Sequence, residues 1–300
     1  MPTDCTDRPP LQAGAASASV LTLVRGREAH LRNLMRGLAR QSVPPLELVI
    51  AWMQPEPASD LPDPGCPVRH LHVSGEPMPL AAARNRAAEA ARGERLIFLD
   101  VDCIPGPGLV AAYAGAPIEA LLLGEVLYLP EGAVGPDLDI AALDHAGRVH
   151  PARPPIPETG LRPEPDATEL WGLSFAVPAG AYAGIGGMDE GFTGYGAEET
   201  DFAVRLAASG LPTCWVAGAR AYHQHHPVHV PPLHHFEHIL RNAVRFHARH
   251  GRWCMEYWLG QFREAGFIAW DADGPAIRRL RAPSPAEIAA TRQPGTCLFS

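Results

Sequence analysis

The chain has 300 residues, enough for one large domain or two small ones with a substantial hydrophobic core. Its apolar fraction of 46% and charged fraction of 19% are those of a soluble globular protein. A formal net charge of −8 argues against a non-specific nucleic-acid binder, and the apolar runs are too short for a transmembrane segment. The N-terminus lacks a signal-peptide core, and the six scattered cysteines contain no C-x-x-C pair. We therefore expect a cytoplasmic protein without a nucleic-acid partner.

Apolar runs of strand length alternate with segments of helical periodicity in the first hundred residues. Residues 1–17 are rich in Pro, Ala and Ser and are expected to form a disordered tail. Strand–helix–strand succession favours parallel pairing, because parallel neighbours need a crossover connection. The pattern predicts an α/β layered sheet that binds ligands at the carboxyl ends of its strands. The predicted strands cover residues 19–24, 46–52, 68–73 and 95–102, and the helices residues 28–42 and 80–92.

Two acidic residues, Asp100 and Asp102, end the strand predicted over residues 95–102. In an extended chain, side chains two positions apart leave the same face of the strand. Two neighbouring carboxylates repel each other unless a cation lies between them, and hard divalent ions such as Mg²⁺ or Mn²⁺ accept such oxygen ligands. An acidic turn without a ligand is the alternative interpretation. The position at a carboxyl end of the sheet favours a site.

Neither of two common nucleotide-binding loops is present. The loop after the first strand reads RGREAHL, without the G-x-G-x-x-G of a dinucleotide fold, and no G-x-x-x-x-G-K sequence occurs. A bound nucleotide would therefore depend on the acid pair and its metal. A short helix after Pro107 and a strand over 120–129 follow. Residues 131–168 show no periodicity, which leaves open a disordered loop or a mobile segment that covers a substrate.

The most specific motifs lie between Trp171 and Asp201, which read WGLSFAVPAGAYAGIGGMDEGFTGYGAEETD. With the upstream Ala83-Arg84-Asn85 and the FLDVD ending at Asp102, they resemble GT-A-fold, family 2-like glycosyltransferases with a galactosyltransferase-type segment. Relatives of this type include galactosyl- and N-acetylgalactosaminyltransferases and chondroitin-type polymerases. The resemblance covers about residues 19–226. It implies a GT-A fold and transfer of a sugar from a nucleotide-diphosphate donor, expected to be a UDP-sugar, to an acceptor hydroxyl.

Glu198 and Glu199 follow a glycine-rich turn and begin a helix predicted over residues 197–209. A carboxylate within hydrogen-bond reach can take the proton of an acceptor hydroxyl as that hydroxyl attacks. Acids in a first helical turn can also simply complement the helix dipole. The resemblance assigns the base to Glu199 and the binding of donor or acceptor hydroxyls to Glu198. A base placed for direct attack implies a single displacement with inversion.

The resemblance also implies roles for other residues, some with a structural alternative. Asp100 would contact the donor ribose or phosphates, and Asp102 would bind the metal. Trp171 would stack on the sugar or the acceptor, unless it belongs to the core. Asp201 is either an acceptor contact or a structural acid, and Arg84 either lies near the donor or on a solvated face. Tyr195 would contact the acceptor, and Arg25 the donor.

Histidines follow the strand predicted over residues 213–222, in the sequence HQHHPVH. If that segment is extended, His223 and His225 share a face. The resemblance implies that one histidine completes the metal site, with His223 the better match and His225 the second. Imidazole beside carboxylate favours Mn²⁺ over Mg²⁺. His234 and His238 have i, i+4 spacing on a helix predicted over 232–250, without an evident third ligand.

We therefore predict a GT-A-like α/β domain over residues 18–226, a helical extension over 227–280 that includes a helix at 253–266, and a tail over 281–300. The predicted activity is metal-dependent glycosyl transfer to a glycan, lipid or small molecule. A sugar nucleotidyltransferase, or a non-catalytic module that binds a nucleotide-sugar or metal, is the alternative. The oligomeric state and peripheral association with a membrane are left open.

Overall fold

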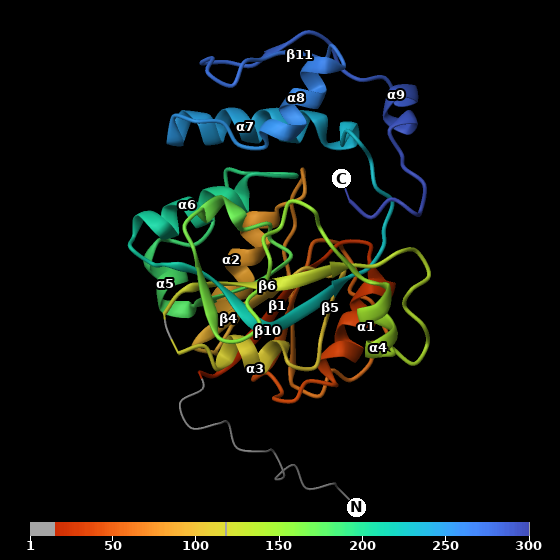
Figure 1. Cartoon of the computed structure of the whole chain (residues 1–300), viewed down its shortest axis with the longest axis vertical. Helices are drawn as coiled ribbons and strands as arrows, with labels where there is room; N and C mark the ends of the chain where they lie inside the picture. Colours follow the sequence, from red (N-terminus) through yellow and green to blue (C-terminus); the bar gives the residue numbers. More distant parts are fainter. Residues whose placement is uncertain (1–15, 118, 300) are drawn as a thin grey trace, which may run out of the picture.

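A ten-stranded mixed sheet forms the centre of the protein (Figure 1), whose computed structural model describes residues 16–117 and 119–299. Two short strands, β7 (Arg148–Val149) and β8 (Leu161–Glu164), pair with β6 and β10 at its side. The main order is β3 (Val68–His72), β2 (Glu47–Trp52), β1 (Ala18–Val24), β4 (Arg95–Leu99), β9 (Ser174–Pro178), β6 (Leu121–Tyr128), β10 (Thr213–His223) and β5 (Cys103–Pro105).

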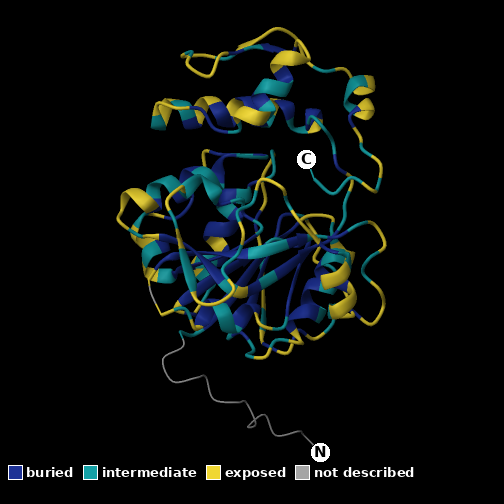
Figure 2. Ribbon diagram, in the orientation of Figure 1, coloured by how far each residue is buried: buried dark blue, intermediate teal, exposed yellow. Residues whose placement is uncertain are grey.

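The first four of these strands pair in parallel, as the alternation of strands and helices predicts. Every residue of β1, β2 and β4 is buried, which explains why these segments read as continuous apolar runs. Strand β9 lies antiparallel between β4 and β6, within a segment for which we predicted motifs but no strand. Figure 2 shows the buried sheet beneath more exposed helices.

Helices cover both faces of the sheet. Helices α1 (Glu28–Leu38) and α3 (Leu109–Ala114) contribute to one buried apolar cluster, whereas α2 (Leu80–Ala90), α5 (Ala179–Gly184) and α6 (Glu198–Ala208) contribute to the other. The two clusters share strands whose alternate side chains point to opposite faces. The result is a three-layer α/β arrangement.

A separate apolar cluster holds the helical extension together, above the sheet in Figure 1. The extension contains α7 (Phe236–His250) after a 3-10 turn at Leu233–His235, and α8 (Glu256–Glu264). A short pair of strands, β11 (Ile268–Ala269) and β12 (Arg278–Arg279), follows. The segment expected to be a tail contains α9 (Pro285–Ala290), which begins with a capping box between Ser284 and Glu287.

Two sequence predictions need correction. The strand predicted over residues 95–102 ends at Leu99, because the chain turns there and the Cys103 N–H donates to the Asp100 carbonyl. Residues 131–168 are not disordered: besides β7 and β8 they contain α4 (Ile140–Ala146) and a 3-10 turn at Ala167–Glu169. Of the tail predicted to be disordered over residues 1–17, residues 1–15 lie outside the described residues, whereas Ala16 and Ser17 form backbone hydrogen bonds with Ala114 and Arg95.

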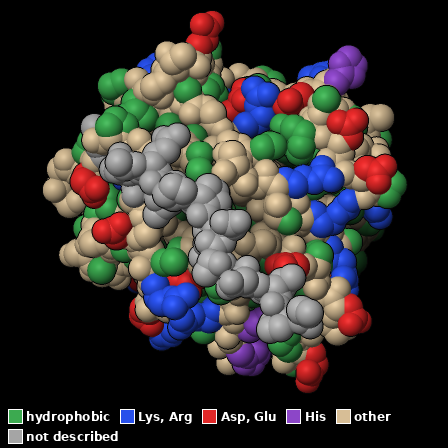
Figure 3. Space-filling view, turned by 90° about the horizontal axis from the view of Figure 1, so that it is seen from below, with side chains coloured by type: hydrophobic (Ala, Val, Ile, Leu, Met, Phe, Trp, Pro, Cys, Tyr) green, Lys and Arg blue, Asp and Glu red, His purple; other side chains and the backbone are tan. Residues whose placement is uncertain are grey.

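None of the helices in the described residues combines the length and apolar character needed to cross a bilayer. Figure 3 views the molecule from the side opposite the extension, where the visible acidic and basic side chains are intermingled. The residues predicted to form a site lie at the other edge of the sheet, facing the extension.

Candidate active site

Asp102 meets two histidines where β4, β5 and β10 come together. The antiparallel pairing of β10 with β5 sets His223 opposite Cys103, so the carboxylate of Asp102 lies beside it. Asp102 Oδ1 lies 3.5 Å from His223 Nε2, and Oδ2 lies 3.6 Å from His226 Nε2. Among the described residues, this is the group of three whose ligand atoms all lie within 4.8 Å of one another and could hold a metal ion.

The protonation of this group suits a metal. Burial alone would raise the pKa of Asp102, but His223, Arg27 and His226 together hold it below its usual value. Burial lowers the pKa of His223, and burial with the charge of Arg27 lowers that of His226 to about 4. Burial thus favours the neutral form of both imidazoles, and the charge of Arg27 favours the ionised carboxylate, which are the forms in which these groups bind metals. The donor set fits Mn²⁺.

The structure places His226, rather than His225, in this group. The same-face argument for His223 and His225 assumed an extended chain, but β10 ends at His223. The Gln224 N–H donates to the Asp102 carbonyl at 2.7 Å, and residues 224–228 beyond the strand have no regular secondary structure. Sequence reasoning also missed Arg27, which forms an ion pair with Asp102. A charged residue in a loop after a strand is too common to signal a site by itself.

The second group is a pair of glutamates held by one buried arginine. Arg84, 5% exposed, extends from α2 to the start of α6. Its Nη1 lies 3.2 Å from Glu198 Oε1, and its Nη2 lies 2.7 Å from Glu199 Oε1. The interpretation of Arg84 as a residue on a solvated face is wrong. Gly172 packs against the Glu199 carboxylate from the other side, in a conformation with φ of +73°.

The two glutamates differ in environment. Burial and the charge of Glu199 raise the pKa of Glu198 to about 8, despite the opposing charge of Arg84. Glu198 Oε2 is buried and has no hydrogen-bond partner among the described residues. The Glu199 side chain remains 17% exposed. Near neutral pH, Glu198 is therefore mainly protonated, and Glu199 is the more accessible carboxylate.

Asp100 interacts electrostatically with charged residues of both the Asp102 group and the glutamate–arginine group. Burial and the charge of Asp102 raise its pKa to about 7, while Arg84 and Arg27 oppose that shift. The charge of Asp100 in turn helps to raise the pKa of Arg84, although burial opposes it. The metal group and the glutamate pair therefore belong to one electrostatic neighbourhood.

Two other predicted site residues are placed elsewhere. Asp201 is fully buried, and its carboxylate lies 2.8 Å from Arg205 Nε, 2.8 Å from Arg249 Nη1 and 2.9 Å from His250 Nε2. These contacts join α6 to α7 and support the structural role over the acceptor role. Arg25 forms a partly exposed ion pair with Glu76 and has no polar contact with the acid pair.

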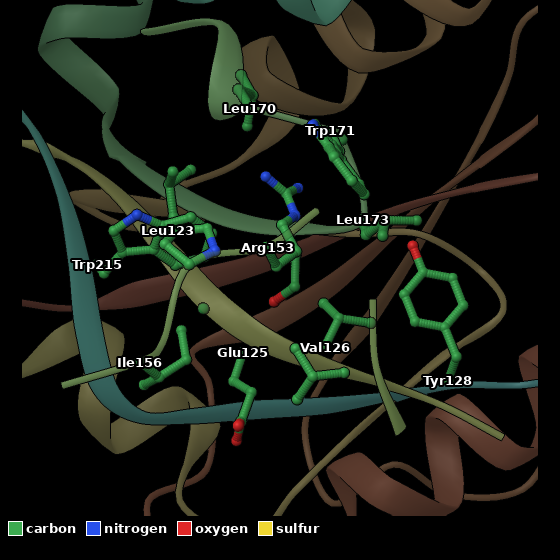
Figure 4. A pocket seen from close by; sticks show the side chains of 15 residues that line it. Leu123, Glu125, Val126, Tyr128, Arg153, Ile156, Leu170, Trp171, Leu173 and Trp215 are labelled. Carbon is green, nitrogen blue, oxygen red and sulfur yellow. The ribbon is translucent and has the colours of Figure 1, made fainter. Parts of the chain in front are cut away.

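Trp171 lines a pocket beside β6 and β10 (Figure 4). The guanidinium carbon of Arg153 lies 3.4 Å from the centre of the Trp171 ring and 5.3 Å from that of Trp215, so it covers one face of Trp171. Tyr195 lies at the junction with the extension, where its ring stacks on His235 with centroids 4.3 Å apart. His234 and His238 also belong to this row of rings and not to the metal-capable group.

Comparisons with known proteins agree with this architecture. Residues 159–229 match the family model described as the N-terminal domain of galactosyltransferase. Validoxylamine A glucosyltransferase from Streptomyces hygroscopicus subsp. jinggangensis (strain 5008) is 29% identical over 154 residues, 44% of this chain and 36% of that protein. A protein of the same name from subsp. limoneus is also 29% identical, over 44% of this chain and 34% of its own. The matched region thus spans about a third of these relatives.

Three solved structures share the fold. A structure of GalNAc-T7 with UDP, GalNAc and Mn²⁺ is 17% identical, with a TM-score of 0.51, over 71% of this chain and 45% of its own. S. aureus TarS 1–349 is 14% identical, with a TM-score of 0.53, over 83% and 72%. The mannosyltransferase PcManGT from Pyrobaculum calidifontis, with GDP-Man and Mn²⁺, is 14% identical, with a TM-score of 0.52, over 88% and 73%. The predicted GT-A-like α/β fold and its resemblance to glycosyltransferases are confirmed.

Proposed function

We propose that the chain is a Mn²⁺-dependent glycosyltransferase that moves a sugar from a UDP-sugar to an acceptor hydroxyl with inversion. The observation that carries this proposal is the pair of groups described above: a carboxylate with two imidazoles whose ligand atoms lie together, and a glutamate pair held by one buried arginine. The structure of GalNAc-T7 holds UDP, GalNAc and Mn²⁺, and that of PcManGT holds GDP-Man and Mn²⁺, which supports the choice of cofactor and substrate class.

Each group matches one requirement of the reaction. The departing nucleoside diphosphate gains negative charge, which Mn²⁺ held by Asp102, His223 and His226 would stabilise. Arg27, paired with Asp102, adds a second positive charge at that end of the site. On the other side, the attacking hydroxyl needs a proton acceptor.

Glu199 is the better base of the two glutamates. It is partly exposed, and its Oε1 is oriented by Arg84 Nη2 at 2.7 Å. Burial and the charge of Glu199 raise the pKa of Glu198, which favours its protonated form and would let its unpartnered carboxyl oxygen donate a hydrogen bond to a sugar hydroxyl. A positioned base that serves the acceptor directly favours a single displacement, and hence inversion.

Replacing Glu199 with glutamine tests the reaction. We expect transfer to fall by about 100-fold or more, because general-base catalysis contributes 10²–10⁴-fold, while binding of UDP with Mn²⁺ remains. Release of UDP from a panel of UDP-sugars, with GDP-mannose as a comparison, measures turnover, and calorimetry measures binding. Normal turnover in the variant would contradict the proposed base. Pyrophosphate-dependent formation of nucleoside triphosphate would instead identify a nucleotidyltransferase, and donor binding without turnover a non-catalytic module.

The histidine assignment has a matched pair of variants. We expect His226→Ala to weaken Mn²⁺ binding by about 10-fold or more, since it removes one of three protein ligands. His225→Ala should leave binding unchanged, because the His225 side chain lies outside the metal-capable group. Titration of Mn²⁺ into each variant, followed by electron paramagnetic resonance, measures free and bound ion. Equal loss in both variants would rule out this ligand set.

A further inference from the structure

Residues 291–299, hereafter the strap, leave the helical extension and return to the site. The strap is anchored near its beginning, where the Val230 N–H donates to the Thr291 carbonyl at 2.9 Å and the Gln293 N–H donates to the Val228 carbonyl at 2.8 Å. His229 pairs with Arg292 as an isolated bridge, and His229 Nδ1 lies 2.9 Å from the Thr291 hydroxyl. These anchors lie only a few residues after the proposed metal ligand His226.

The strap also lines a second pocket, partly through residues of its anchor. Arg292, Gln293 and Gly295 form part of a wall shared with His226. Gly295 packs so closely against the Glu131 carboxylate that a methyl group there would overlap it. The strap therefore contributes to a pocket that a proposed metal ligand also lines.

The strap places an aromatic ring between the metal-capable group and the pocket of Trp171. The Phe299 ring lies edge-on to Tyr128, with centroids 5.1 Å apart, and to His150, with centroids 4.7 Å apart. Tyr128 in turn contacts the ring of His223 at 4.7 Å, and His150 contacts Trp171 at 4.8 Å. Phe299 thus bridges a row of rings that runs from a proposed metal ligand to the pocket of Trp171.

We propose that the strap is a component of the substrate site, in which Phe299 forms a wall that keeps water away from the donor sugar. This inference rests on the proposed glycosyl transfer. In the competing reaction, a water oxygen bonds to C1, the bond from C1 to the phosphate oxygen breaks, and Glu199 takes the water proton. The products are free sugar and nucleoside diphosphate. Excluding water from the site suppresses this hydrolysis relative to transfer.

Phe299→Ala tests the wall, with Leu298→Ala as the matched control, because Leu298 is the adjacent strap residue and carries no ring that could contact Tyr128 and His150 as Phe299 does. We expect Phe299→Ala to raise the ratio of free sugar to transferred sugar several-fold. Mn²⁺ affinity should be affected less than in His226→Ala, because Phe299 is not one of the three metal-capable residues. Phe299→Tyr should restore the wild-type ratio. An unchanged ratio in an active Phe299→Ala enzyme, or an equal rise in Leu298→Ala, would overturn the inference.

A second readout does not need activity. Cys297 lies two residues before Phe299, with its thiol 3.2 Å from the Phe299 carbonyl, and it is partly exposed, whereas Cys66, Cys103, Cys214 and Cys254 are buried. In a Cys5→Ser background, we expect a maleimide to label Cys297 faster in Phe299→Ala than in the wild type. The end of the strap then loses the ring contacts of Phe299 with Tyr128 and His150, so that Cys297 becomes more accessible. Equal labelling rates would overturn the inference. Absence of both transfer and hydrolysis in the wild type would instead refute the proposed function, and the labelling comparison would still test the strap.

Discussion

Replacing Arg84 with leucine is expected to lower the free energy of unfolding by about 3–5 kcal/mol, the range for removing one partner of a buried ion pair. Arg84 is 5% exposed and is the cation that both Glu198 and Glu199 contact. Without Arg84, a negative charge on Glu199 would have no compensating cation and would lie next to the buried carboxyl group of Glu198. We also expect transfer to be lost, because the carboxylate proposed as the base loses the guanidinium that orients it.

Urea denaturation at pH 7 measures the change in stability, and Arg86→Leu is the control. Arg86 lies on the same helix, but its side chain is 51% exposed and pairs with Glu89 on the surface. Its loss should change stability by no more than about 1 kcal/mol. Adding Glu199→Gln to Arg84→Leu should recover part of the stability, since the uncompensated charge is then gone. If the two arginine variants were equally stable, the buried pair would have no energetic role.

Replacing Gly172 with alanine is expected to reduce transfer by about 100-fold, the effect of misplacing a catalytic group by about an ångström. A methyl group at this position would lie 2.8 Å from the Glu199 carboxyl carbon and closer still to its Oε1. Backbone with φ of +73° also disfavours a side chain, by about 1–2 kcal/mol. The carboxylate must therefore move, whereas the Asp102 group is untouched.

Initial rates of transfer, with Mn²⁺ binding as a second measurement, test this expectation. Gly180→Ala is the control, because a methyl group there meets nothing within 4 Å and the residue lies in helix α5. In that helix, alanine should be neutral or stabilise by up to about 1 kcal/mol. Unchanged transfer in Gly172→Ala would show that Glu199 does not need its present position.

Much of the fold could be predicted from the sequence, because its central strands are buried on both faces and so read as continuous apolar runs. The alternation of these strands with helices predicted the parallel half of the sheet. Strand β9 could not be predicted in the same way, because its five residues lie inside a glycine-rich stretch that resembles a loop. Its place between β4 and β6 depends on long-range pairing, which local patterns do not encode.

The candidate site was predictable only in part. Glu198, Glu199, Asp102 and His223 could be named because each belongs to a compact motif. Arg84 was named as lying either near the donor or on a solvated face, but an arginine in an alanine-rich helix gives no local sign that it is buried against the two glutamates. Arg27, which comes from a distant loop, was missed altogether. His226 was missed because the rule of alternating faces fails once a strand has ended.

The buried Asp201 links the position of the helical extension to that of helix α6. Arg205 lies on the same helix as this carboxylate, whereas Arg249 and His250 belong to α7. The two contacts with α7 therefore join α6 to the extension. Glu198 and Glu199 lie within one turn of Asp201, at the beginning of α6. A tilt of the extension relative to the sheet would therefore shift the positions of the Glu198 and Glu199 carboxylates. The helical extension is in this way connected directly to α6, the helix that carries the proposed base.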